Sequence, residues 1–113
     1  MKFKTTQSGP VTVIELQGNL MGGPDASTLN SKLHELVEAG KKQVVIDLRG
    51  VQFMNSSGLG LLIGGASTMK NAGGALKLAN ASEKITALMK ITKLFVLFES
   101  YPSVEAAVES VKK

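Results

Sequence analysis

The sequence predicts a single α/β domain whose central sheet is mostly parallel, with an antiparallel hairpin at the N-terminus and about four flanking helices. Two observations lead to this prediction. Short runs rich in Val, Ile and Leu alternate with longer segments whose apolar residues recur every three or four positions, which is the pattern of repeated strand–helix–strand units. The chain has 113 residues, of which 43% are hydrophobic, and this is enough for one core. We therefore expect one domain over residues 1–113.

The first half of the chain predicts a hairpin, a helix and a buried strand. Residues 2–7 and 11–16 are expected strands, because a Ser-Gly-Pro turn separates them. Pro24 suits the first position of a helix, and apolar residues with helical spacing follow it as far as Gly40. Residues 44–48 form a β-branched run without alternation, which is typical of a central strand covered on both faces.

The second half predicts three more helices and two more strands. Helical spacing extends over residues 57–71, and two glycines then precede an expected strand at residues 75–79. Ser82 is placed to cap a third helix, residues 96–98 resemble a final strand, and apolar residues over 104–111 share one helical face.

Composition and charge exclude several classes of function. The net charge is +4, but the lysines are mostly isolated, Arg49 is the single arginine, and the aromatic residues are not interleaved with the cations. We therefore expect no nucleic-acid partner. The absence of cysteine excludes disulfides, zinc–thiolate sites and thiol chemistry. Neither a secretory signal nor a run of about 20 apolar residues is present, so we expect a cytoplasmic protein without a membrane span.

The sequence also gives no indication of an enzyme, a metal site or a bound cofactor. His34 is the single histidine, and it lies off the apolar stripe of its helix, so we expect it to face solvent. The run from Gly58 to Ile63 lacks the third glycine of a dinucleotide-binding fingerprint. Asp47 is isolated on its strand, and we interpret it as a structural residue.

Three small polar residues stand immediately before the helix at residues 57–71. Asn55, Ser56 and Ser57 are all able to accept a hydrogen bond from a free N–H group of the first helical turn. A cap needs only one of them, so the other two are available for another role.

This helix also predicts a docking surface. On a helical wheel, Leu61, Gly64, Gly65 and Thr68 fall on the side away from the apolar stripe, and we therefore expect Leu61 and Gly65 to face outward. Each glycine inside a helix costs about 1 kcal/mol relative to alanine. We infer that a partner uses the close approach that the glycines allow.

The segment from Asp47 to Gly60 resembles the central signature of the STAS domain family, specifically the bacterial anti-sigma factor antagonists. The resemblance extends over nearly the whole chain. Further matching segments are residues 18–26, 74–81, 91–95 and 101–107.

This resemblance implies a STAS fold and a phosphorylation switch. In the family, an anti-sigma factor that is itself a serine kinase phosphorylates the second serine of an Asp-Ser-Ser-Gly sequence, which corresponds to Ser57. The kinase binds the ATP, and a serine phosphatase reverses the reaction. Ser56 is then the neighbour of the acceptor and Gly58 the residue of close approach. Asn55 occupies the position where many members have Asp, so the kinase has one carboxylate fewer to recognise.

The resemblance also implies that the loop containing Gly22 and Gly23 contributes to partner binding, together with the residues around Ser57. Two functions remain open from the sequence. The first is an anti-sigma factor antagonist that sequesters its kinase while Ser57 is unphosphorylated and thereby frees a sigma factor. The second is a scaffold subunit of a transporter or of a stress-signalling assembly, without a sigma-factor role.

Overall fold

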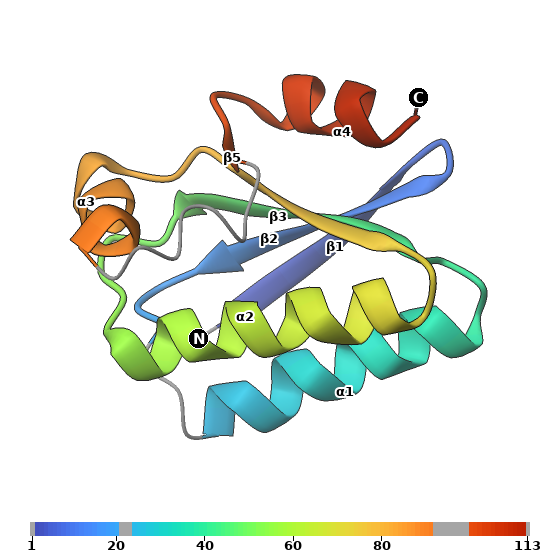
Figure 1. Ribbon diagram of the computed structural model, residues 1–113, viewed down its shortest axis with the longest axis horizontal. Helices are drawn as coiled ribbons and strands as arrows, with labels where there is room; N and C mark the ends of the chain where they lie inside the picture. The colour runs from blue at the N-terminus through green and yellow to red at the C-terminus, as the bar shows by residue number, and fades with distance from the viewer. Residues whose placement is uncertain (1, 21–23, 92–99, 113) are drawn as a thin grey trace.

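The computed structural model describes residues 2–20, 24–91 and 100–112 (Figure 1). Its elements follow the order that the sequence predicts. They are β1 (Lys2–Ser8), β2 (Val11–Gln17), α1 (Pro24–Glu38), β3 (Gln43–Gly50), α2 (Ser56–Asn71), β4 (Ala75–Ala79), α3 (Glu83–Ile91), β5 (Ser100–Tyr101) and α4 (Val104–Lys112). The expected strand at residues 96–98 lies outside the described residues.

The five strands form one sheet in the order β1-β2-β3-β4-β5. β1 pairs with β2 in an antiparallel hairpin, and the remaining neighbours are parallel. β3 lies at the centre, and its residues 44–48 are all buried, which confirms the expectation for an apolar run without alternation. The predicted mixed sheet with an N-terminal hairpin is therefore confirmed.

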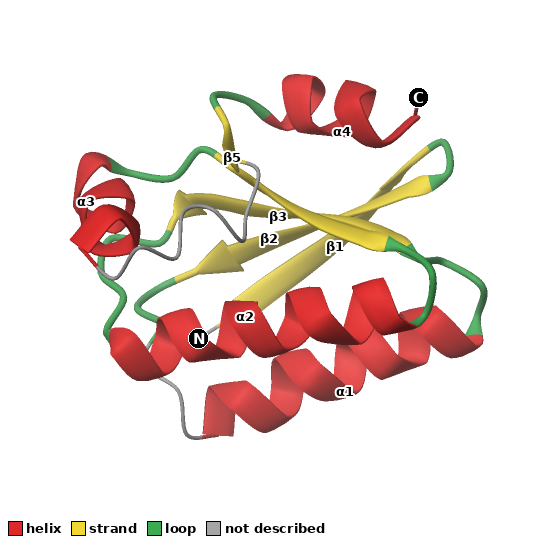
Figure 2. Ribbon diagram, in the orientation of Figure 1, coloured by secondary structure: helices red, strands yellow, loops and turns green. Residues whose placement is uncertain are grey.

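Helices cover both faces of the sheet (Figure 2). α1 and α2 lie side by side against one face, where residues such as Ile14, Ile46 and Leu62 form the larger apolar core. α4 covers the other face over a smaller cluster that includes Val45 and Val108. Burial of these apolar faces is the main stabilising contribution to the fold.

α3 lies at the end of the molecule where β2 and β3 end and α2 begins (Figure 2). The Ser82 hydroxyl accepts a hydrogen bond from the Ile85 N–H at 3.2 Å, so the predicted cap of this helix is confirmed. The carboxyl ends of parallel strands are where α/β proteins commonly carry their sites. Among the described helices, none combines the length and the apolar character that crossing a bilayer requires.

Candidate functional site

The loop between β3 and α2 is held in place by the loop that follows β2. Leu20 and Met54 form an isolated parallel bridge. The Leu20 N–H donates to the Phe53 carbonyl at 3.0 Å, and the Asn55 N–H donates to the Leu20 carbonyl at 3.3 Å. Both Leu20 and Met54 are buried. The backbone that leads into the two serines is therefore positioned by hydrogen bonds and by the core.

Asn55 is the residue that caps α2. Its backbone is extended, with φ −96° and ψ −178°, and its side-chain oxygen accepts a hydrogen bond from the Gly58 N–H at 2.8 Å. Of the three candidates in the sequence, the structure thus selects Asn55. Ser56 and Ser57 are the first two residues of the helix, and both are exposed.

Gly58 contacts the protein interior rather than the surface. A β-carbon at this position would overlap the carbonyl oxygen of Leu20, so only glycine fits without a backbone shift. Gly58 is buried. The sequence led us to expect that a partner approaches Gly58, but the close approach in the structure is made by the Leu20 backbone of the same chain, and burial leaves a partner no direct access to this residue.

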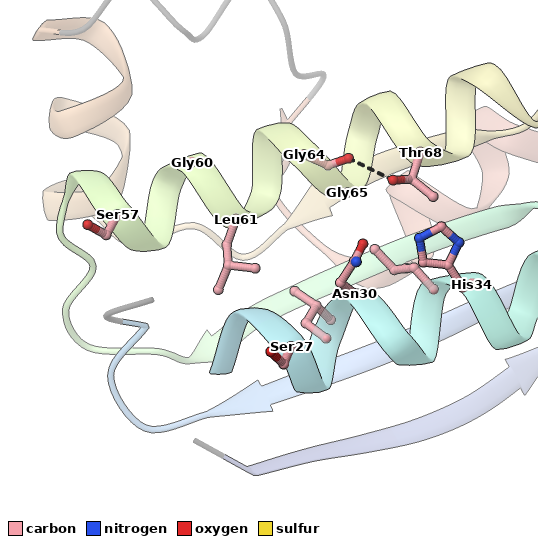
Figure 3. Close-up of a pocket in the computed structure, with 11 residues that line it drawn as sticks. Ser27, Asn30, His34, Ser57, Gly60, Leu61, Gly64, Gly65 and Thr68 are labelled. Carbon is pink, nitrogen blue, oxygen red and sulfur yellow. Dashed lines mark hydrogen bonds between the residues drawn. The ribbon is translucent and has the colours of Figure 1, made fainter. Parts of the chain in front are cut away.

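A groove of about 600 Å³ lies between α1 and α2, with Ser57 at one end and His34 toward the other (Figure 3). The described residues that line it include no Asp, Glu, Lys or Arg, and its polar groups are neutral hydroxyls, an amide and an imidazole. The lining residues are Ser27, Leu29, Asn30, Leu33, His34, Ser57, Gly60, Leu61, Gly64, Gly65 and Thr68. The site is suited to an uncharged, partly apolar surface.

The structure corrects the expected orientation of two groove residues. Leu61 is half-buried and packs against the larger core, whereas we expected it to be exposed. Gly65 is buried, because α2 approaches α1 at this point. A β-carbon on Gly65 would lie 2.8 Å from Leu33 Cδ1 and 3.4 Å from Leu76 Cδ1. Gly65 therefore permits helix packing, and its expected outward position is wrong.

The glycines that do open toward the groove are Gly60 and Gly64. Both are exposed, and a β-carbon on either would meet nothing within 4 Å. Gly60 was not among the residues predicted to face outward, whereas Gly65 was. The missed signal is the spacing of the small residues, because Gly58 and Gly65 continue the buried stripe of Leu62 and Met69 with steps of three or four residues.

Other predicted residues fall into three groups. His34 is exposed, as expected, and it also lines the groove from the α1 side. Asp47 is buried and structural, because its Oδ1 atom accepts hydrogen bonds from the Arg49 N–H at 3.0 Å and the Asn80 amide at 2.9 Å. Gly22 and Gly23 lie outside the described residues. Within the described part of the chain, no group of three metal-ligating side chains comes together.

The model of the STAS domain family matches residues 2–107 of this chain. The chain belongs to the STAS domain family. A curated STAS relative, the anti-sigma-B factor antagonist of Bacillus subtilis strain 168, is 40% identical over 83 residues, which are 71% of this chain and 75% of the relative.

Solved structures share the STAS fold. An anti-sigma factor antagonist from Mycobacterium paratuberculosis has a TM-score of 0.84 at 21% identity, with 99% of this chain and 94% of that chain covered. The Bacillus cell fate determinant SpoIIAA in its phosphorylated form has a TM-score of 0.74 at 21% identity, with 97% and 99% covered. These likenesses confirm the arrangement of elements that the resemblance implies.

Proposed function

We propose that this STAS domain is an anti-sigma factor antagonist that is switched by phosphorylation of Ser57. While Ser57 is unphosphorylated, the domain sequesters an anti-sigma factor that is a serine kinase, and a sigma factor is thereby freed. The kinase binds the ATP and phosphorylates Ser57, and the complex then dissociates. A serine phosphatase restores the unmodified state. We propose a cytoplasmic protein that acts by binding and carries no catalytic residues of its own.

The observation that carries the proposal is the position of the Ser57 hydroxyl. It is exposed on the first turn of α2 at one end of the groove. The cap is supplied by Asn55, so the Ser57 oxygen is not needed to hold the helix start. A kinase is therefore able to use this hydroxyl without opening the fold.

Two relatives support the proposal. The Bacillus subtilis relative, 40% identical to this chain, is named as an antagonist of an anti-sigma factor. SpoIIAA, which shares the fold, is known in a phosphorylated form. The phosphorylated form is a property of SpoIIAA. We propose the same modification for Ser57 of this chain because its hydroxyl is exposed at the start of α2.

A phosphate at Ser57 has a physical reason to act as a switch. It carries about −1.5 to −2 charges, and it would stand at the positive end of the α2 dipole, where free N–H groups favour an anion. The fold therefore tolerates it. The groove lining, however, includes no Asp, Glu, Lys or Arg among the described residues. A partner that fits this groove would have to bury the phosphate dianion without a Lys or Arg among the described groove residues to pair with it, and the desolvation penalty would weaken binding.

The direct test is phosphorylation and binding with the Bacillus subtilis anti-sigma-B factor, the protein that the 40% identical relative is named for opposing. With ATP we expect one phosphate, located on Ser57 by peptide mass mapping. Ser57→Ala removes the phosphate and keeps binding. Ser56→Ala is the matched control, since Ser56 is also exposed on the same turn, and this variant should keep both binding and phosphorylation.

Ser57→Asp tests the charge separately from the chemistry. We expect it to fold normally and to bind at least about tenfold more weakly, because a carboxylate then stands at the groove. Full-strength binding by a stable Ser57→Asp protein would contradict the electrostatic switch. Equal affinity of wild type and all Ser57 variants for the partner would instead favour a scaffold role.

A further inference from the structure

The two most exposed large apolar side chains in the described part of the chain line the same hollow. Phe53 is 47% exposed and Ile91 is 79% exposed. Phe53 belongs to the loop before α2, and Ile91 is the last residue of α3. Single exposed apolar residues are ordinary, but two that converge on one cavity mark an interaction surface.

The hollow has a volume of about 360 Å³ and an apolar floor. Met54 and Ile85, both buried, connect it to the larger core, and α3 forms one wall. Phe53 is displayed from a fixed backbone, because its carbonyl accepts the Leu20 N–H at 3.0 Å. A partner side chain that enters here meets a preformed surface, so little ordering entropy opposes its binding. The lining residues are Phe53, Met54, Lys84, Ile85, Ala87, Leu88 and Ile91.

Charge selects the kind of partner. Lys84 is the one charged residue among the described residues that line the hollow, and it is exposed. A second copy of this chain that docked symmetrically through the hollow would bring one Lys84 toward another, which is unfavourable. A segment that carries an apolar side chain next to a carboxylate would instead match both the floor and the rim.

Position indicates which protein supplies this segment. Phe53 and Met54 directly precede Asn55 and the two serines, and α3 lines the same hollow as Phe53 and Met54. A protein that handles Ser57 is therefore within reach of the hollow. The same adjacency makes a protein a better match than a lipid surface, which has no reason to coincide with the serine.

We propose that the hollow formed by Phe53, Ile91 and α3 is a second docking site for the anti-sigma factor, and that it receives an apolar side chain flanked by an acidic residue. This inference rests on the proposed function. It adds a contact on the α3 side of the Ser57 loop to the groove between α1 and α2, and it predicts that recognition depends on residues that never touch the phosphate.

The test measures binding of the unphosphorylated chain to the Bacillus subtilis anti-sigma-B factor. Ile91→Ser should weaken binding at least tenfold with little change in melting temperature, since Ile91 is 79% exposed. Phe53→Ser should weaken binding by a similar factor with a modest fall in melting temperature, since Phe53 is 47% exposed. Lys84→Glu should weaken binding by a similar factor. Lys90→Glu is the matched control on the same helix, because Lys90 does not line the hollow, and its effect should stay below threefold.

Kinetics give a second readout. A docking site away from the reacting hydroxyl predicts that Ile91→Ser raises KM for phosphorylation of Ser57 and leaves kcat unchanged. A fall in kcat with KM unchanged would overturn the proposal, as would equal binding by wild type, Ile91→Ser and Lys84→Glu.

The remaining outcomes separate the two proposals. If wild type binds the anti-sigma factor and the hollow variants bind equally well, the docking site fails and the proposed function stands. If wild type neither binds nor is phosphorylated, both fail. Two further results would overturn the proposal. If wild type binds phosphatidylglycerol vesicles and Ile91→Ser does not, the hollow belongs to a lipid surface. If wild type forms a dimer in sedimentation velocity and Ile91→Ser does not, the hollow belongs to a second copy of this chain.

Discussion

Replacing Gly60 or Gly64 by alanine should make the domain more stable. Both positions are exposed inside α2, and a β-carbon on either meets nothing within 4 Å. Glycine in a helix interior costs about 1 kcal/mol relative to alanine. For a chain of 113 residues, unfolding entropies of ordinary domains convert this gain into a rise in melting temperature of about 4 °C for each substitution.

The same substitutions should weaken partner binding. Both glycines line the groove beside Ser57, and an added methyl group would hold a partner's backbone away from α2. We expect binding of the Bacillus subtilis anti-sigma-B factor to fall about tenfold, which corresponds to about 1.4 kcal/mol. Stability and affinity would then change in opposite directions, which a general loss of structure cannot produce.

Thermal melts and binding titrations on the same samples test both halves of this prediction. Gly58→Ala is the control, because a β-carbon there overlaps the Leu20 carbonyl oxygen and should lower the melting temperature sharply. A lower melting temperature for Gly60→Ala or Gly64→Ala would refute the open position of these residues. Higher stability with unchanged affinity would instead show that the partner does not use the groove.

Four further substitutions test the cap and the packing of α2. Asn55→Ala should lose about 1 kcal/mol of unfolding free energy, because it removes the hydrogen bond from the Gly58 N–H. Ser57→Ala should stay within about 0.5 kcal/mol of wild type in denaturant titrations. A larger loss for Ser57→Ala than for Asn55→Ala would show that Ser57 is the cap. Leu61→Glu should weaken partner binding by about 2 kcal/mol and also lower stability, because Leu61 is half-buried against the core. Gly65→Glu should lower the melting temperature most, since its β-carbon would lie 2.8 Å from Leu33 Cδ1, and a stable folded variant would contradict the helix contact.

The order of elements was predictable because its signals are local. Pro24 marks the start of α1, the glycines after α2 mark its end, and the uninterrupted apolar run in β3 indicates burial on both faces. Each of these signals acts within a few residues, where propensity and turn chemistry decide. The predicted cap of α3 at Ser82 has the same local origin.

The orientation of the small residues of α2 was not predictable in the same way. Gly58 is enclosed by Leu20 and Gly65 by Leu33, and both contacts join segments that are distant in the sequence. A glycine carries no hydropathy that would assign it to the core or to the surface. The helical wheel therefore followed the large apolar residues and counted Gly65 as outward.

The identity of the cap needed tertiary structure as well. Asn55, Ser56 and Ser57 have similar capping ability, so the sequence left all three open. The choice follows from the bridge between Leu20 and Met54, which keeps the loop extended up to Asn55. The helix then begins at the next residue.

Asn55 also makes the cap and the switch chemically independent. Its amide oxygen holds the Gly58 N–H, so a phosphate on Ser57 has no cap to displace. A carboxylate at position 55 would cap equally well, but it would place a negative charge two residues from the phosphate and oppose it. Asn55→Asp should therefore keep the melting temperature of wild type, and the yield of phosphorylated protein distinguishes two effects of the carboxylate. A lower yield would report repulsion between the carboxylate and the phosphate, and a higher yield would report recognition by the kinase of the Asp that the family resemblance places at this position.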